Sequence, residues 1–549
     1  MNGNTLRDAI ISGANNITNN RQAVDELNVF PVPDGDTGTN MSMTINNAVK
    51  ELVKCDNKTA SEVADITASA LLRGARGNSG VILSLLFRGF AKGLKGKDEL
   101  DAEGLTNAME LGVAAAYKAV MKPTEGTVLT VARVAAENAR VAFNEGKSTI
   151  EIFETILKAG GEALASTPEI LPVLKKAGVV DAGGKGFMVI LEGMYSVLKD
   201  GKMIDATNAE GRQESSSNNS ATGSSYDTEI TFTYCTEFII NRESETEPKI
   251  LRAYLETIGD CVVVVDDEEI IKVHVHTNNP GKAIEKAITF GQLVNIKIEN
   301  MRDQHERVKH DAAANEEKAD DLKPVAIEKK YGFVAVAAGE GLSNLFTELG
   351  SDIVVSGGQT MNPSTDDILK AIEATPAEYV YVFPNNKNII MSAEQAVPLS
   401  TRKVIVIPTR TIPQGITSML SFNPDDDSET NAINMAAACQ NVSSGSITFA
   451  ARDSSFDGYN IKEGELLALD NGKISFVEKP DQLKKCVTRL TKSLCKKDSS
   501  FITLIYGCDI NNADAESIAD AVRANVSDSI EVNLIKGDQP VYYFLISVE

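Results

Sequence analysis

The sequence predicts a multidomain protein in which an all-α domain is followed by a small α+β domain and then by an α/β domain. The 549 residues are enough for about three or four domains of ordinary size. Two stretches too polar to form a core interrupt the chain, and the spacing of apolar residues changes after the first of them. The expected division is a helical domain 1–205, a linker 206–226, a middle domain 227–310, a linker 311–330 and an α/β domain 331–549.

The two linkers differ in composition. Residues 206–226 are rich in Ser, Asn and Gly, which is typical of a flexible connection that buries no apolar surface. Residues 311–330 are charged and rich in alanine, which indicates a stiffer second connection.

Apolar residues in the first segment recur every three or four positions, the period of amphipathic helices. Residues typical of helix N-termini, including Thr39, Ser79 and Ser148, stand at the start of several of these stretches. An all-α bundle or barrel follows from this pattern. The expected helices are 5–19, 39–53, 60–73, 79–94, 102–121, 127–144, 148–166 and 183–200.

The later segments change period. In the middle segment, 229–240 and 268–277 alternate like strands, and 251–259 between them has a helical pattern. In the last segment, the apolar runs GFVAVAA, SDIVVS, EYVYVF and KVIVIP alternate with helical stretches. That alternation is typical of βαβ crossovers and a parallel sheet.

The net charge of −23 argues against binding nucleic acid or anionic lipid through charge, since both require a positive surface. The seven cysteines are scattered and include no C-x-x-C pair, which suits free thiols in the cytoplasm. The N-terminus lacks a signal-peptide core, and the longest apolar runs are far shorter than the ~20 residues of a membrane span. We therefore expect a cytoplasmic protein without a transmembrane segment.

The stretch LNVFPVPDGDTGTNM, residues 27–41, carries the strongest chemical signal. Asp34 and Asp36 lie two apart on a glycine turn just before a helix start, a spacing at which both carboxylates can reach a hard cation such as Mg²⁺. The free N–H groups of the following helix start can hold phosphate. No Walker motif is present, and an ordinary acidic turn with a helix cap is the alternative explanation.

Three further glycine-rich turns precede helices. They contain Arg73, Arg76, Asn78 and Ser79 in LLRGARGNSG; Glu125, Gly126 and Thr127 in KPTEGTVLT; and Asp181, Gly183, Gly184 and Lys185 in DAGGKGF. A capped interhelical turn explains any one of them. Four in one helical domain are more than loop closure requires.

The strings NVFPVPDGDTGTNM, LLRGARGNSG, KPTEGTVLT and DAGGKGF resemble the ATP-binding domain of dihydroxyacetone kinases, an eight-helix barrel. The whole layout, with a middle unit and a DegV-like C-terminal region, resembles the ATP-binding subunit of bacterial fatty-acid kinase. That resemblance implies ATP, a pair of Mg²⁺ ions, a DegV-type fatty-acid carrier as partner, and a homodimer.

The resemblance also implies roles for individual residues. Asp34 and Asp36 would ligate Mg²⁺, and a third aspartate of the family pattern is replaced by Val29, which leaves Asn28 as the nearest oxygen ligand. Arg76, with Arg73 as the alternative, would neutralise phosphate charge. The expected nucleotide contacts are Thr37, Gly38, Thr39 and Asn40 on phosphate, Asn78 and Ser79 in the pocket, and Gly126, Thr127, Asp181 and Gly183 at its rim.

Two interpretations of the middle segment stay open. Cys235, His274 and His276 lie on expected strands and have the chemistry of three zinc ligands with a fourth position open. The resemblance to fatty-acid kinases, whose middle unit is similar, favours zinc. The alternative is that these residues simply occupy a polar strand face.

In the last segment, the loops 356–365, 382–388 and 408–415 each follow an expected strand and precede a helix. In an open parallel sheet such loops gather at the carboxyl ends of the strands, where ligands bind. Turn chemistry alone is the competing explanation. The region would either hold a lipid or bind the separate fatty-acid carrier.

The leading functional hypothesis is ATP-dependent phosphorylation of a fatty-acid carboxylate presented by a DegV-type carrier, giving an acyl phosphate. One alternative is phosphorylation of a small hydroxy-ketone, as in dihydroxyacetone kinase. A second is a non-catalytic lipid-binding protein whose helical domain only senses nucleotide.

Overall fold

A computed structural model describes residues 1–28, 35–120, 123–206, 233–244, 246–266, 270–300, 322–358, 361–450, 454–456 and 459–549. The chain forms two compact units, Met1–Arg212 with Leu322–Glu549, and Gln213–Asp321. The two expected linkers fall largely outside the described residues. Residue Leu322 already packs against the C-terminal core, and the Val325 N–H donates to the carbonyl of Glu373.

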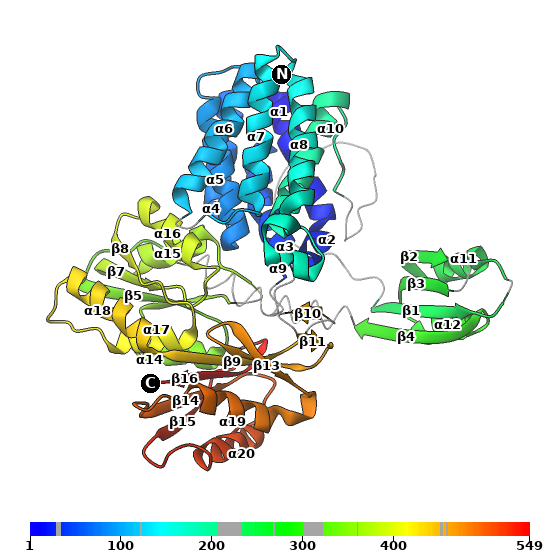
Figure 1. Ribbon diagram of the computed structural model, residues 1–549. Helices are drawn as coiled ribbons and strands as arrows, with labels where there is room; N and C mark the ends of the chain where they lie inside the picture. The colour runs from blue at the N-terminus through cyan, green and yellow to red at the C-terminus, as the bar shows by residue number, and fades with distance from the viewer. Residues whose placement is uncertain are drawn as a thin grey trace. The chain divides into compact units, whose positions relative to one another are not determined.

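The N-terminal region is helical, and the eight helices expected from apolar periodicity are confirmed (Figure 1). Two short helices, α2 (Arg21–Glu26) and α9 (Pro172–Ala177), had no sequence prediction. The long helices are α1 (Gly3–Asn19), α3 (Thr37–Leu52), α4 (Ala60–Gly74), α5 (Gly77–Gly93), α6 (Ala102–Ala119), α7 (Val128–Asn144), α8 (Thr149–Ile170) and α10 (Ala182–Asp200).

Local sequence determines where several of these helices begin. Thr59 and Ser148 form capping boxes with Glu62 and Glu151, so that side chains satisfy the first N–H groups of α4 and α8. Asp181 accepts from the Gly184 N–H at the start of α10. The chemically interesting turns therefore lie at fixed helix ends.

The long helices of the described region close into a ring, because α10 packs back against α1. The Asn16 side chain on α1 donates to the Val189 carbonyl on α10 at 2.7 Å. A Cβ placed on Gly193 would lie 2.7 Å from the Cα of Gly13, so the two backbones approach as closely as glycine allows. One apolar core runs through the ring.

The second unit is a small α+β fold, as expected. Its sheet has the order β2-β3-β1-β4, and every strand pair is antiparallel. Its core includes Phe238, Leu251 and Phe290. The elements are β1 (Tyr234–Arg242), α11 (Pro248–Ile258), β2 (Gly259–Asp266), β3 (Ile270–Thr277), α12 (Pro280–Ile288) and β4 (Gly291–Asn300).

The C-terminal region begins with the expected parallel sheet, in the order β6-β5-β7-β8. The strands coincide with the four apolar runs recognised in the sequence, which confirms the βαβ prediction for this part. The elements are β5 (Lys329–Ala337), α14 (Glu340–Glu348), β6 (Ile353–Ser356), α15 (Thr365–Ala374), β7 (Ala377–Phe383), α16 (Ile390–Ala396), β8 (Lys403–Val406), α17 (Ile412–Leu420) and α18 (Ser428–Asn441).

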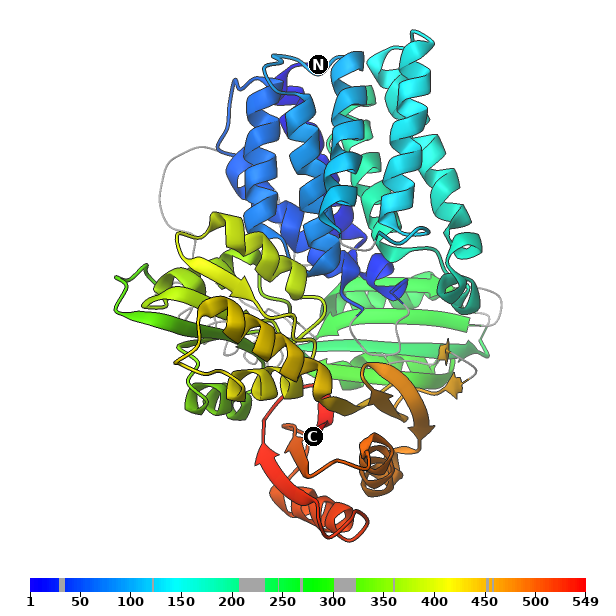
Figure 2. The ribbon, with the colours of Figure 1, turned by 60° about the vertical axis from the view of Figure 1, so that its left-hand side comes forward.

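A second, mixed sheet follows that the βαβ pattern did not predict. Its order is β13-β12-β9-β16-β14-β15, and only β14 and β15 run parallel. Helices α19 and α20, orange to red, cover one face (Figures 1 and 2). The elements are β9 (Ser443–Phe449), β12 (Leu466–Asp470), β13 (Lys473–Glu478), α19 (Leu483–Leu494), β14 (Phe501–Tyr506), α20 (Asn512–Arg523), β15 (Glu531–Lys536) and β16 (Tyr542–Val548), with a short β10–β11 pair (Ser454–Phe456, Tyr459–Ile461). No helix of the described residues is long and apolar enough to cross a membrane.

Candidate nucleotide and metal site

The start of α3 forms one half of the candidate site. Asp36 is the N-cap residue, and its carbonyl accepts from the Asn40 N–H at 2.7 Å. A Cβ on Gly38 would lie 2.2 Å from the Arg21 carbonyl oxygen, so only glycine fits where α3 passes α2. Thr37 is the first residue of α3, and Asp34 lies outside the described residues.

Asp25, which the sequence did not single out, anchors this helix start. Its carboxylate accepts from the Thr39 N–H at 3.0 Å and from the Thr39 hydroxyl at 2.7 Å. A carboxylate at a helix N-terminus satisfies a free N–H and opposes the positive end of the helix dipole. The two residues are 14 apart in sequence, outside the local spacings by which caps are recognised.

The start of α5 lies directly beside that of α3. The Arg76 N–H donates to the Thr44 hydroxyl on α3 at 3.2 Å. Gly77 has φ +58°, and a Cβ there would lie 2.6 Å from Nδ2 of Asn40. Asn78 and Ser79, the second and third residues of α5, therefore lie close to Asn40, as the shared pocket in the prediction requires.

The C-terminal region supplies two amides to the same place. Nδ2 of Asn362 donates to Oδ2 of Asp36 at 2.7 Å, and Nδ2 of Asn78 donates to Oδ1 of Asn388 at 3.3 Å. Asn362 and Asn388 belong to two of the three loops expected at the carboxyl ends of the parallel strands. Residues in loops of the C-terminal region thus contact the helix starts that carry the phosphate and metal motifs.

The Arg76 guanidinium points to the same loop. Its Nη1 donates to the Asn362 carbonyl at 2.8 Å, and its Nη2 lies 3.5 Å from Oδ2 of Asp367. Arg73, the alternative cation, is exposed in the last turn of α4. In this structure Arg76 joins the two regions.

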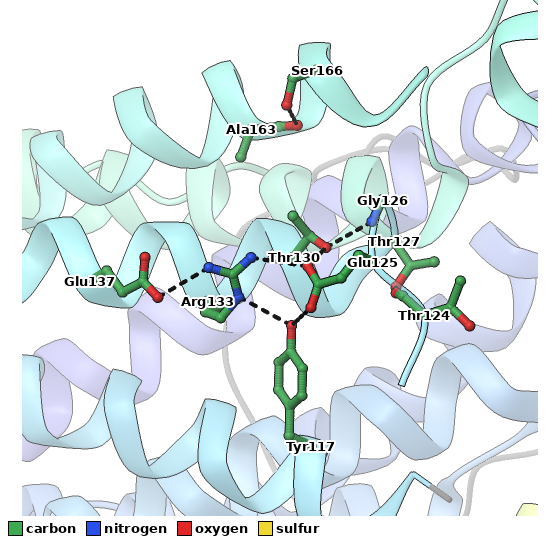
Figure 3. A network of polar contacts seen from close by, with 10 residues as sticks. All are labelled: Tyr117, Thr124, Glu125, Gly126, Thr127, Thr130, Arg133, Glu137, Ala163 and Ser166. Carbon is green, nitrogen blue, oxygen red and sulfur yellow. Dashed lines mark hydrogen bonds and ion pairs between the residues drawn. The ribbon is translucent and has the colours of Figure 1, made fainter. Parts of the chain in front are cut away.

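A polar network holds the turn before α7 (Figure 3). The Gly126 N–H donates to the Thr130 hydroxyl, which donates to Glu125 at 2.6 Å. Tyr117 and Arg133 also donate to Glu125, each at 2.9 Å. The Thr130 hydrogen bond, followed by those of Arg133 and Tyr117, holds the pKa of Glu125 below its usual value despite partial burial.

This network fixes the backbone where the rim of the pocket was expected. Gly126 has φ +84°, and the Thr127 hydroxyl donates to the Thr124 carbonyl at 2.7 Å. A left-handed backbone conformation favours glycine, so the turn has little freedom to accept another residue.

Asp181 lies beside this turn, at the start of α10. Its carboxylate accepts from the backbone N–H groups of Gly184 and Val128, and its own N–H donates to the Thr167 hydroxyl at 3.1 Å. Burial raises the pKa of Asp181 to about 6, although both accepted hydrogen bonds oppose the shift. Gly183 lies against the same carboxylate.

The two groups of helix starts occur at the same end of the ring. A Cβ on Gly186, in the first turns of α10, would lie 2.6 Å from the sulfur of Met41 in α3. The structure thus brings together residues from four turns that are separated by more than a hundred positions in the sequence.

The donors near Asp36 fit a hydrated Mg²⁺ ion. Carboxylate and amide oxygens are groups that this ion and its bound waters prefer as partners. Oδ1 of Asn78 and Oδ1 of Asn362 are both buried without a hydrogen-bond partner among the described residues. Side chains in the described part of the chain include no group of three or more His, Cys, Asp or Glu residues arranged to hold a metal. Asn28 follows α2, and its carbonyl oxygen would lie 3.7 Å from a Cβ on Gly35.

The backbone of the second unit brings the proposed zinc ligands onto adjacent strands. β1 and β3 are antiparallel neighbours, with Cys235 paired to His276 and Glu237 paired to His274. The sequence did not show that these strands are adjacent. The side chains of Cys235, His274 and His276 are outside the described part of the structure, so zinc binding stays a prediction.

The three C-terminal loops line one cavity of about 660 Å³, as their positions after parallel strands predicted. Its wall includes Gly357, Asn385 and Arg410 from these loops and Ser444 and Tyr542 from the mixed sheet. Pro172 and Val173 of α9 also line it. The cavity thus borders both sheets and the helical region.

A ring of helices with polar starts, joined to a small α+β unit and an α/β region with a cavity, defines a multidomain protein with a kinase-related helical domain. Three family descriptions match consecutive parts of the chain: the DAK2 domain over residues 31–196, the FakA-like middle domain over 231–308, and the FakA-like C-terminal domain over 332–549. FakA is one of the subunits of fatty acid kinase. The chain belongs to the FakA-like family of fatty acid kinase subunits.

Known proteins similar to this chain include a full-length relative and two distant structural neighbours. Protein YloV of Bacillus subtilis is 39% identical over 555 residues, covering 100% of this chain and 99% of the relative. The structural neighbours are a fatty-acid-binding DegV family protein from Thermus thermophilus and the dihydroxyacetone kinase of C. freundii in complex with AMP-PNP and Mg²⁺. The first has TM-score 0.29 and 12% identity, covering 40% of this chain and 99% of that one. The second has TM-score 0.28 and 13% identity, covering 35% and 33%.

Proposed function

We propose that the chain is the ATP-binding subunit of a fatty-acid kinase, with an eight-helix barrel of the dihydroxyacetone-kinase type and a DegV-like C-terminal region. It would transfer the γ-phosphoryl group of ATP to a fatty-acid carboxylate presented by a DegV-type carrier. The contact of Asp36 and Asn78 with loops of the C-terminal region is the observation that carries the proposal. It joins a metal- and phosphate-type site to the region whose family description names fatty acid kinase.

The chemistry needs few catalytic groups. A fatty carboxylate is already ionised at neutral pH, so its oxygen can attack the γ-phosphorus without a general base while the bond to the ADP oxygen breaks. The helix starts at Thr37 and Gly77 present free N–H groups to phosphate, and Asp34 and Asp36 would hold Mg²⁺. Bound Mg²⁺ supplies neutralisation of the phosphate charge. The products are ADP and an acyl phosphate.

The test is ATP turnover by the full chain with fatty acid, with and without a purified DegV-type carrier, and with dihydroxyacetone as control. We expect acyl phosphate only when the carrier is present. Turnover on dihydroxyacetone without acyl phosphate formation would contradict the proposal and favour the small-ketone alternative.

The C-terminal cavity favours one second candidate, a lipid-binding protein whose helical domain only senses nucleotide. A volume of about 660 Å³ lies in the range of small-molecule pockets. Fatty acid retained through purification, together with nucleotide binding and no turnover under any condition, would support this candidate.

We also propose a homodimer formed through the second unit. The edge strand β4 exposes Val294, Ile296 and Ile298 on alternate positions, at 38%, 49% and 44% of their surface. An edge strand with a row of exposed apolar residues is a surface at which chains associate. Light scattering should give twice the chain mass for the wild type and a lower mass for Ile296→Glu.

A further inference from the structure

We propose that Asn362 of the C-terminal region is a positioning residue of the metal–nucleotide site in the helical domain. The inference rests on the proposed function, since it assigns a task to Asn362 only if that site binds a metal–nucleotide. The Asn362 side chain is 2% exposed, and its Nδ2 donates to Oδ2 of Asp36 at 2.7 Å. A partner of this kind fixes the orientation of a metal-ligating carboxylate, and losing one commonly costs about 10- to 100-fold in metal affinity.

The loop that carries Asn362 is held by backbone as well as by side chains. Arg76 and Ser364 form an antiparallel bridge, and the Thr365 N–H donates to the Ala75 carbonyl at 3.1 Å. Arg76 adds a hydrogen bond to the Asn362 carbonyl and an ion pair with Asp367. Contacts on both sides of Asn362 therefore determine where its amide lies.

The other end of the amide has no use in the described structure. Oδ1 of Asn362 is buried and has no hydrogen-bond partner among the described residues. A buried acceptor without a donor is unfavourable, so a group that brings a donor to this position gains by it. A hydrated Mg²⁺ ion bound at Asp36 carries such donors in its waters, because this ion usually retains several of them.

The placement makes metal binding depend on a residue 326 positions away, in another region of the chain. When the loop is in place, Asn362 orients Asp36 with its nitrogen and accepts from the hydrated ion with its oxygen. When the loop leaves, both interactions are lost, and the helical domain binds metal more weakly.

The experiment measures Mn²⁺, used as an EPR-visible substitute for Mg²⁺, binding to the full chain in the presence of AMP-PNP. Asn362→Leu is expected to weaken Mn²⁺ binding about tenfold or more, while AMP-PNP binding without metal and the unfolding temperature stay unchanged. Asn362→Ala carries the same test should the leucine variant fail to fold.

A matched pair of charge changes tests the loop. Asp367→Asn, which removes the ion pair with Arg76, should weaken Mn²⁺ binding. Asp366→Asn makes the same change one residue earlier, where the partner is Lys370 on the same helix, and should bind Mn²⁺ normally. Wild-type Mn²⁺ affinity in folded Asn362→Leu would overturn the inference and leave the proposed function standing. A wild-type chain that binds no Mn²⁺–AMP-PNP would overturn both.

Discussion

Asp25 holds both the backbone N–H and the hydroxyl of Thr39, at 3.0 and 2.7 Å. The carboxylate thereby closes the connection between α2 and α3 just beyond the acidic turn. The sequence predicts a phosphate contact for the same Thr39 hydroxyl, so its bond to Asp25 assigns it a structural task in this structure.

Removing this anchor should destabilise the helical domain. Asp25→Ala leaves the α3 start without its side-chain acceptor, a change that costs about 1 kcal/mol at a typical helix cap. The unfolding temperature of the full chain measures the effect. Asp65→Ala, an exposed carboxylate on α4, is the control and should leave it unchanged. Equal stability of the two variants would contradict the anchoring role.

Asp36 should be essential for turnover. We expect Asp36→Ala and Asp34→Ala to abolish ATP turnover and Asp36→Asn to be nearly as severe, because a neutral amide cannot balance the charge of Mg²⁺. The assay is carrier-dependent acyl phosphate formation, with circular dichroism to verify the fold. Near-normal activity of Asp36→Ala would show that the metal is held elsewhere.

Gly77 should tolerate no side chain. Gly77→Ala forces a left-handed backbone on alanine and places its Cβ 2.6 Å from the Asn40 amide, so both stability and Mg-ATP affinity should fall. Gly161→Ala is the matched control, because nothing lies within 4 Å of that position in α8. There alanine should stabilise the helix by up to about 1 kcal/mol. Thermal unfolding and calorimetric ATP titration measure both variants.

The buried Asp181 carboxylate should make stability fall with rising pH. Its folded pKa is about 6, above the ordinary value near ~3.9, so between about pH 4 and pH 6 the folded chain holds a proton that the unfolded chain has released. This stability is complete below about pH 4 and lost as the pH rises through about 6. Asp181→Asn keeps a capping acceptor without the charge, and should unfold at a higher temperature than wild type at about pH 7.5 but not at about pH 4.

Asp101→Asn provides the opposite sign. Asp101 also caps a helix, and although burial opposes it, hydrogen bonds from the Gly104 N–H and Lys97 lower its pKa. Its charged form therefore stabilises the folded chain at neutral pH, so Asp101→Asn should lower the unfolding temperature at about pH 7.5. Shifts of the same sign in the two variants would contradict the pKa assignments.

The middle unit should contain zinc. Metal analysis of the purified chain should give about one zinc per chain, lost on mutation of Cys235, His274 or His276. The pairing of Cys235 with His276 across β1 and β3 supplies the required proximity of the backbone. Metal-free protein, with unchanged unfolding temperature in His274→Ala, would return these residues to the polar-strand interpretation.

Apolar periodicity was sufficient to predict the eight long helices, because each buries a continuous apolar stripe in the ring. The Gly-, Thr- and Asn-rich turns likewise indicated which helix starts carry polar chemistry. The mixed sheet was missed, although Asn471-Gly472 between β12 and β13 is a recognisable hairpin signal, with φ of 47° and 80°.

The missing parts of the site are non-local. Asp25 lies 14 residues from Thr39, and Asn362 lies 326 residues from Asp36, so no spacing rule connects either pair. Asn362 also stands in a loop whose composition is fully explained by turn chemistry. Only the packing of the C-terminal region on the helix starts distinguishes it from its neighbours.

The pairing of α1 with α10 has a consequence for synthesis of the chain. The Asn16 amide and the contact between Gly13 and Gly193 need a helix that leaves the ribosome long after the first. Until α10 emerges, α1 has no wall on one side, and its apolar face stays open to water or to chaperones. Contacts between the two ends of a domain are reached slowly, because a long loop must close first. The helical ring therefore folds as a whole once Asp200 has been released, and a chain stopped before α10 is a substrate for proteolysis.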